Sequence, residues 1–101
     1  HIGGFQRALQ IAAVVGAKAM PVVIGQGSAC TPILSAAEMH LHAAMKNAQP
    51  GGEMTGFLRL SEQTVFSCIE VERAIVTLTN RPGVGITVNR EKLAELISED
   101  F

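Results

Sequence analysis

The sequence contains no tryptophan and no tyrosine, and four phenylalanines make up its whole aromatic content of 4%. Proteins that bind single-stranded nucleic acid present aromatic rings on which bases stack, so this scarcity argues against such a platform. Eight basic and nine acidic side chains give a net charge of −1. Because no basic surface for DNA, RNA or an anionic membrane is predicted either, we do not expect nucleic acid as a partner.

Cysteine is also scarce. Cys30 and Cys68 stand far apart, with no CxxC and no histidine-rich pattern, so neither a disulfide framework nor a structural zinc site is predicted. No apolar run approaches the ~20 residues that cross a bilayer. Gln6, Arg7 and Gln10 interrupt the apolar start too early for a signal peptide. We therefore expect a soluble protein of the cytoplasm that does not engage a membrane.

Aliphatic residues are abundant instead. The 101 residues are 48% hydrophobic, which suits one compact unit or a piece of one. The chain begins with His1, two residues before a helical pattern and without a lead-in. We expect further sequence upstream of it in the complete protein.

Helical periodicity marks two segments in the first half. Apolar residues recur at i, i+3, i+4 and i+7 from Phe5, which predicts a helix that stops at Gly16. Thr31 before Pro32 is typical of an N-cap and first helical position, and predicts a second helix over residues 31–46. The Pro-Gly-Gly sequence that follows cannot easily continue it.

Extended segments fall between and after these helices. The apolar run at residues 21–24 is bounded by glycine, which indicates a strand buried on both faces of a parallel sheet. Residues 69–79 mix β-branched and charged side chains, and we interpret them as one extended strand that leads into the turn at 80–83. Asn89 is a predicted N-cap for a short last helix with Glu91 in its first turn. Helices alternating with buried strands indicate right-handed β/α units.

Four motifs in one order extend this interpretation. They are Ile-Gly-Gly-Phe at 2–5, Val-Ile-Gly-Gln-Gly-Ser at 23–28, Pro-Gly-Gly-Glu-Met-Thr-Gly at 50–56, and Arg-Pro-Gly-Val-Gly-Ile at 81–86. With them, nearly the whole chain resembles the C-terminal part of the mandelate-racemase and muconate-lactonizing branch of the enolase superfamily. The match is to a Gly-Gly step after the sixth barrel strand, the seventh and eighth strands with their loops, and a closing turn.

The resemblance implies an α/β fold: the C-terminal portion of a TIM-type (β/α) barrel, with a tail that returns to an α+β capping domain outside this chain. Residues 1–60 would form the last β/α units of the barrel. Residues 61–101 would form a strand and a helix that return toward the cap. The boundary is expected at 58–63, where the β/α alternation ends.

The resemblance also implies the chemistry. Enzymes of this family form an enolate from a carboxylate substrate and stabilise it with a divalent metal. Mg²⁺ or Mn²⁺ would be held by three carboxylates, and two lysines would act as acid and base; all would precede His1. The expected partners are a small-molecule carboxylate, the rest of the barrel and cap, and further copies in a homo-oligomer. The 101-residue chain alone is expected to be inactive.

One acidic residue is assigned a catalytic or substrate-orienting role, with an ordinary loop carboxylate as the alternative. Glu53 follows a Gly-Gly pair at the carboxyl end of a predicted barrel strand, where such barrels present active-site groups. Gln26, Gly27 and Ser28, in the loop after the predicted seventh strand, and Met54 are assigned to substrate binding. For the loop, the alternative is a plain strand-to-helix connection that needs glycine for its turns.

Two histidines invite a metal interpretation that their spacing does not support. His40 and His42 are two residues apart, so they point to different sides of a helix rather than converging as an i, i+4 pair would. No metal ligand is therefore assigned to this chain.

The family includes several reactions. Since no histidine occurs between Pro21 and Pro32, the resemblance favours the two-lysine cycloisomerase-like subgroup, with muconate cycloisomerase as the leading function. Glutamate at position 53, rather than aspartate, favours cycloisomerases over dipeptide epimerases. A dipeptide epimerase, an o-succinylbenzoate synthase and a non-catalytic small α/β interaction module remain the alternatives.

Overall fold

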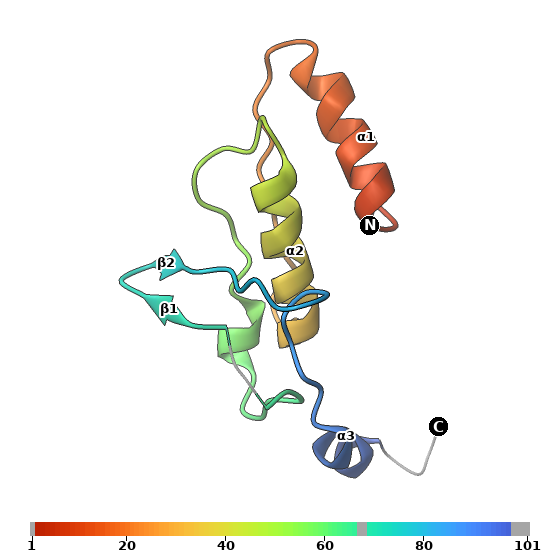
Figure 1. The fold of residues 1–101 in the computed structure, drawn as a ribbon, viewed down its shortest axis with the longest axis vertical. Helices are drawn as coiled ribbons and strands as arrows, with labels where there is room; N and C mark the ends of the chain where they lie inside the picture. The colour runs from red at the N-terminus through yellow and green to blue at the C-terminus, as the bar shows by residue number, and fades with distance from the viewer. Residues whose placement is uncertain (1, 67–68, 98–101) are drawn as a thin grey trace.

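The computed structural model describes residues 2–66 and 69–97. Its elements, in chain order, are α1 (Phe5–Gly16), α2 (Pro32–Ala44), the 3₁₀ helix η1 (Gly56–Arg59), β1 (Val71–Glu72), β2 (Ile75–Val76) and α3 (Arg90–Leu96). α1 and α3 lie at opposite ends of the long axis, and α2 lies between them (Figure 1). None of the helices in the described ranges is long and apolar enough to cross a membrane.

The helices confirm most of the predicted boundaries. α1 ends at Gly16 and α2 begins at Pro32 with Thr31 as N-cap, although the threonine side chain makes no capping hydrogen bond. α2 ends at Ala44 rather than at residue 46, because Met45 already has extended backbone angles. Beyond the helix, the Asn47 carbonyl accepts a hydrogen bond from the Val22 N–H at 2.8 Å.

The two segments predicted as neighbouring strands do run in parallel, but they form a single bridge instead of a ladder. Val22 pairs with Ala48: the Val22 N–H donates to Asn47, and the Gln49 N–H donates to Val22, both at 2.8 Å. The pairing then skips to residue 53, whose N–H donates to the Ile24 carbonyl at 3.1 Å. The strand predicted at 21–24 and the barrel strand predicted to end near Glu53 are therefore neighbours and parallel, as expected, but neither forms a regular strand.

Local chemistry explains the interruption. The short stretch from Val22 to Ile24 on one side faces the longer stretch at 49–53 on the other. Pro50 in that stretch has no N–H to donate, and the φ of Gly51 is 82°. The chain therefore bulges between two points of parallel contact.

The single extended strand predicted at residues 69–79 is instead a hairpin. β1 and β2 pair antiparallel, with Val71 opposite Val76 and Glu72 opposite Ile75. The two connecting residues, 73 and 74, are arginine and alanine and have φ of 49° and 64°. Positive φ at both positions is the geometry of a type I′ turn, which usually requires Asn or Gly. Because Arg73 and Ala74 are neither asparagine nor glycine, these two residue types do not predict the turn.

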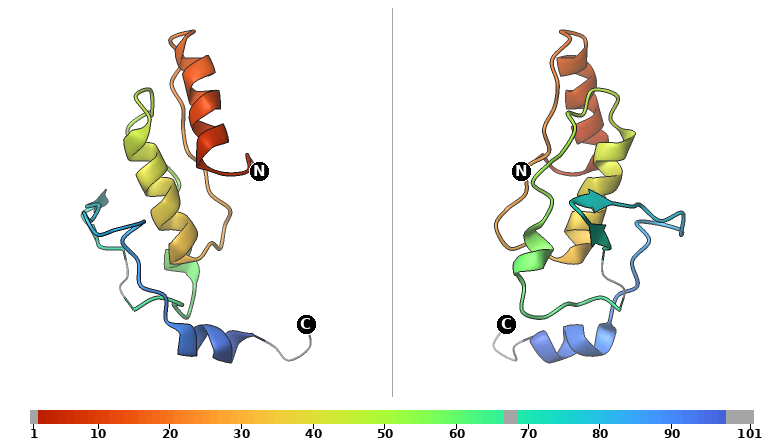
Figure 2. Two further views of the ribbon diagram at one scale, coloured as in Figure 1. Left: turned by 45° about the vertical axis from the view of Figure 1, so that its right-hand side comes forward. Right: turned by 90° about the vertical axis from the view of Figure 1, so that its left-hand side faces the viewer.

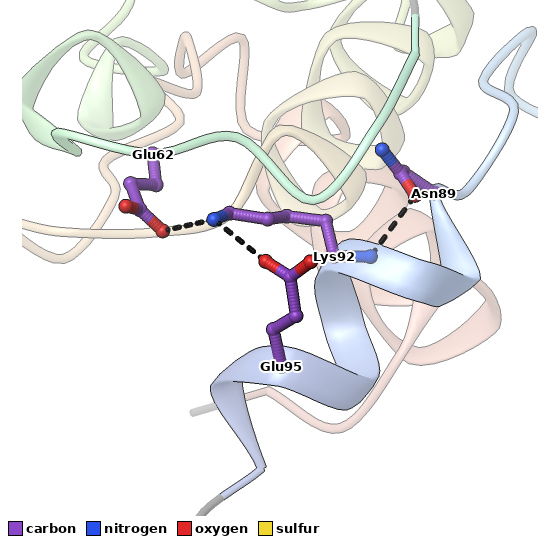
Figure 3. A network of polar contacts seen from close by, with 4 residues as sticks. All are labelled: Glu62, Asn89, Lys92 and Glu95. Carbon is purple, nitrogen blue, oxygen red and sulfur yellow. Dashed lines mark hydrogen bonds and ion pairs between the residues drawn. The ribbon is translucent and has the colours of Figure 1, made fainter.

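Residues 87–89, which lead into α3, pair with residues 64–66, which lie before the hairpin. The Phe66 N–H donates to Thr87 at 3.0 Å and the N–H of residue 89 donates to the carbonyl of residue 64 at 2.9 Å, on either side of an antiparallel bridge. In α3, Lys92 Nζ lies 2.9 Å from Glu62 and 3.0 Å from Glu95 (Figure 3). Hydrogen bonds to these two carboxylates raise the pKa of Lys92. The division into barrel and tail at residue 60 stays a prediction.

The buried core is small for a chain of this length. Its central cluster, the apolar core, consists of Ile24, Met39, Met54 and Phe57. The chain exposes 7625 Å² to solvent, whereas a compact monomer of 10.7 kDa exposes about 5,500 Å². Its radius of gyration is 15.0 Å, against about 13 Å for a compact domain of this length. The open, elongated arrangement is visible from two further sides in Figure 2.

Candidate functional site

Glu53 lies where the two parallel segments meet for the last time. Its N–H is bound to Ile24, and its side chain is exposed. The carboxylate oxygen Oε2 lies 3.5 Å from the point that a Cβ on Gly25 would occupy. Glu53 is therefore held by its backbone, while its carboxylate lies in solvent beside the loop that begins at Gly25.

Gly27 and Ser28 continue that loop and are both exposed. The Gly27 carbonyl accepts a weak hydrogen bond from Cys30 Sγ at 3.4 Å, and the Ser28 carbonyl lies 3.5 Å from the Arg59 guanidinium, at the limit of hydrogen bonding. Their predicted contact with substrate stays a prediction.

Met54 points the other way. Its side chain is only 9% exposed and belongs to the apolar core with Ile24, Met39 and Phe57. Adjacent residues on an extended backbone point to opposite sides, which sends Met54 inward as Glu53 faces out. The predicted role of Met54 in substrate binding stays a prediction; in this structure the side chain packs beneath the site.

Gln26 makes the densest set of polar contacts near Glu53. Its Nε2 donates to Glu38 Oε2 at 2.5 Å and to Ser35 Oγ at 2.9 Å. Its Oε1 accepts from the Gly56 N–H at 2.7 Å and lies 3.2 Å from the Ser35 hydroxyl, which can donate to it. The predicted substrate contact of Gln26 stays a prediction, and the partners that the amide has here are all internal.

The three partners of Gln26 were not predicted from the sequence. Ser35 is fully buried and Glu38 is partly buried, both on α2, while Gly56 opens η1. Burial raises the pKa of Glu38, and the hydrogen bond from Gln26 opposes that shift with a smaller effect. One available signal was the spacing of Ser35 and Glu38, since residues three apart share a face of a helix. That face also carries the buried Met39.

A divalent metal does not fit the described residues by themselves. Among residues 2–66 and 69–97, no three His, Cys, Asp or Glu side chains lie together so that they could hold an ion. His40 and His42 donate to different backbone carbonyls, those of Ala36 and Gln49, each at 2.9 Å. The two rings therefore do not converge, as their spacing predicted.

Comparison with known proteins places this geometry in a family. A family model described as enolase C-terminal domain-like matches residues 1–92. A crystal structure of muconate lactonizing enzyme from Klebsiella pneumoniae superposes with a TM-score of 0.87 at 24% sequence identity. The match covers 97% of this chain and 27% of that enzyme, so the chain spans about a quarter of its relative's length. A search of curated protein sequences found no match. The chain belongs to the enolase C-terminal domain-like family and has the fold of the C-terminal region of muconate lactonizing enzyme.

Proposed function

We propose that this chain is the C-terminal portion of an enolase-superfamily isomerase or lyase that forms an enolate from a carboxylate substrate. The reaction proposed is cycloisomerisation of the muconate-lactonizing kind, and the chain contributes the last β/α units of the barrel to it. Family membership supports the class of enzyme. The name of the structural relative supports muconate as the first substrate to test.

The observation that carries the proposal is the position of Glu53. Two consecutive parallel segments reach their carboxyl ends side by side, joined by the bond from Glu53 to Ile24. In (β/α) barrels the catalytic side chains project from this end of the strands. The exposed carboxylate of Glu53 is thus presented at the edge where a substrate would be held, beside the Gly27 and Ser28 backbone.

At that position a carboxylate has two uses. It accepts a hydrogen bond from a cationic acid–base group or from the substrate, and it counters the positive charge of a proton donor while charge develops on the enolate. A preorganised group of this kind accelerates the reaction without being consumed. Mg²⁺ or Mn²⁺ would be bound by residues outside this chain.

The test is the substitution Glu53→Gln in the complete protein. Glutamine keeps the size of the side chain but cannot carry charge or exchange a proton. Turnover of muconate, followed by loss of diene absorbance with Mg²⁺ or Mn²⁺ present, should fall by roughly 10²-fold. The melting temperature should change little, because the side chain is exposed.

A matched control is Glu72→Gln, which neutralises another exposed carboxylate, on β1, and should leave turnover unchanged. Turnover by Glu53→Gln within about threefold of the wild-type value would show that Glu53 has no catalytic role. Failure of the wild-type protein to lactonize muconate would remove the cycloisomerase assignment. Epimerisation of dipeptides would then be the next reaction to assay.

A further inference from the structure

We propose that Gln26 is a positioning residue: its side-chain amide fastens the loop after residue 24 to α2 and to the start of η1, and so sets where the Glu53 carboxylate lies. This inference rests on the proposed function of Glu53. It assigns to Gln26 an internal role instead of direct substrate contact.

The amide joins three parts of the chain that are far apart in sequence. Nine residues separate Gln26 from Ser35, twelve separate it from Glu38, and thirty separate it from Gly56. Ser35 is fully buried and Gly56 is buried, while Gln26 and Glu38 are partly buried, so these hydrogen bonds are partly shielded from water.

A primary amide is the side chain that these partners require. The Gly56 N–H can only donate and needs an acceptor, whereas the ionised Glu38 carboxylate can only accept and needs a donor. Gln26 supplies both through Oε1 and Nε2, and the two partners fix which end of the amide faces which. A glutamate in its place would lose the donor, and a hydrocarbon would leave the buried Gly56 N–H without a partner.

The absence of a side chain at Gly56 lets η1 lie directly against the loop at residues 26–30. A Cβ there would lie 2.7 Å from Gln26 Oε1, 2.8 Å from the Cys30 nitrogen and 3.0 Å from the Gly27 oxygen. Two of these neighbours are backbone atoms that cannot swing aside. The loop and η1 thus touch backbone to backbone, and the amide closes the contact.

Two hydrogen bonds hold the stretch that runs from Glu53 to Gly56. Its own N–H is bound to Ile24, and three residues later the Gly56 N–H is bound to Gln26. Both anchors come from one segment, 24–26, so the stretch from 53 to 56 is held at each end by the same part of the chain. Without the Gln26 bond, only the Ile24 bond would orient the residue, and small displacements of a catalytic group are costly to rate.

The experiment compares four variants of the complete protein: Gln26→Ala, Gln26→Glu, Glu38→Gln and the double variant Gln26→Glu/Glu38→Gln. Amide hydrogen exchange at Gly56 and turnover of muconate are measured in each. Gln26→Ala removes the acceptor for Gly56, and Gln26→Glu sets two carboxylates against each other. Each should speed Gly56 exchange by about tenfold and lower turnover by about tenfold.

The other two variants should behave like the wild type. Glu38→Gln keeps an amide oxygen that accepts from Gln26, so exchange and turnover should both be retained. The double variant reverses the polarity of the contact, because the amide introduced at position 38 donates to the carboxylate introduced at position 26. That carboxylate still accepts from the Gly56 N–H, so exchange and turnover should both be restored. A double variant as impaired as Gln26→Glu would contradict the positioning role.

Gln63→Ala is the matched control. Gln63 is also partly buried and also bonds to η1, through its Nε2 and the Phe57 carbonyl at 2.8 Å. Its loss should lower the melting temperature but leave Gly56 exchange and turnover near the wild-type values, which separates positioning from general stability. Unchanged Gly56 exchange in Gln26→Ala would overturn the inference.

Two outcomes separate this inference from the proposed function. If Glu53→Gln abolishes turnover while Gln26→Ala leaves it unchanged, Glu53 is catalytic and Gln26 does not position it. If Gln26→Ala lowers turnover further in the Glu53→Gln background, Gln26 acts independently of Glu53 and the inference is wrong.

Discussion

Folding makes the carboxyl group of Glu38 harder to ionise. Burial raises its pKa above the usual 4.5, so the folded state binds a proton more readily than the unfolded state. The stabilising contribution of protonated Glu38 is complete below pH 4.5 and is lost as the pH rises through the raised pKa. At neutral pH the ionised side chain therefore costs stability.

Glu38→Gln should remove that cost. The new amide oxygen still accepts from Gln26, so the melting temperature should rise slightly at pH 7, and the advantage should disappear below about pH 4. Thermal unfolding at several pH values measures both. A variant less stable than wild type at pH 7 would mean that the charged hydrogen bond to Gln26 outweighs the desolvation of Glu38.

Gly56 offers a steric prediction. Gly56→Ala places a methyl group within 3.0 Å of backbone atoms of Cys30 and Gly27, so the free energy of unfolding should fall by about 1–3 kcal/mol. Gly27→Ala is the comparison, because its Cβ would meet only Cys30 Sγ at 3.4 Å. Chemical denaturation should show a clear loss for the first and little for the second; equal losses would contradict the steric account.

Single residues of the site were predictable to different degrees. Glu53 was singled out by a local signal, its place after Gly-Gly at the expected end of a strand; the structure has no regular strand there, and the catalytic role of Glu53 stays a prediction. The partners of Gln26 were not predicted, because Ser35, Glu38 and the start of η1 reach it only once α2 has folded back on the preceding segment. Met54 was assigned to substrate binding, and that role stays a prediction; alternation along the extended chain turns its side chain inward in this structure.

At the scale of elements, helices were predicted well and extended segments poorly. The boundaries of α1 and the start of α2 depend on periodicity and caps within a few residues. The hairpin and the interrupted parallel pair depend instead on partners elsewhere in the chain. The hairpin also depends on positive φ at Arg73 and Ala74, residue types that rarely adopt it.

The caps of two helices give a prediction at this scale. Asn89 Oδ1 accepts from the Lys92 N–H at 3.0 Å, whereas Thr31 makes no such bond at α2. Asn89→Ala should therefore cost about 1 kcal/mol of unfolding free energy, and Thr31→Ala only a few tenths. Denaturant titration of the two variants tests this. Similar losses at both positions would show that the cap bond of α3 adds no stability beyond what Thr31 provides without one.

At the scale of the whole molecule, the chain exposes more apolar surface than a compact protein of its length does. Among the described residues, sixteen large apolar side chains are at least 38% exposed, including Phe5, Ile11 and Val14 on α1 and Val23 in the segment that follows it. Soluble proteins rarely leave so much apolar surface uncovered. This excess argues against a self-contained interaction module, and it supports the proposal that the rest of a barrel covers these apolar faces.

The 101-residue chain prepared alone should therefore behave differently from the complete protein. Its exposed surface of 7625 Å² exceeds that of a compact monomer by about 2,100 Å². It should self-associate in size-exclusion chromatography and bind a hydrophobic dye such as ANS, as partly covered cores do. It should also show no micromolar Mg²⁺ binding by calorimetry, since three carboxylates do not meet among its described residues. A monomeric, dye-silent chain would mean that the fold is complete in these residues and that the barrel interpretation is wrong. Micromolar Mg²⁺ binding would contradict the expectation that the metal ligands lie outside this chain.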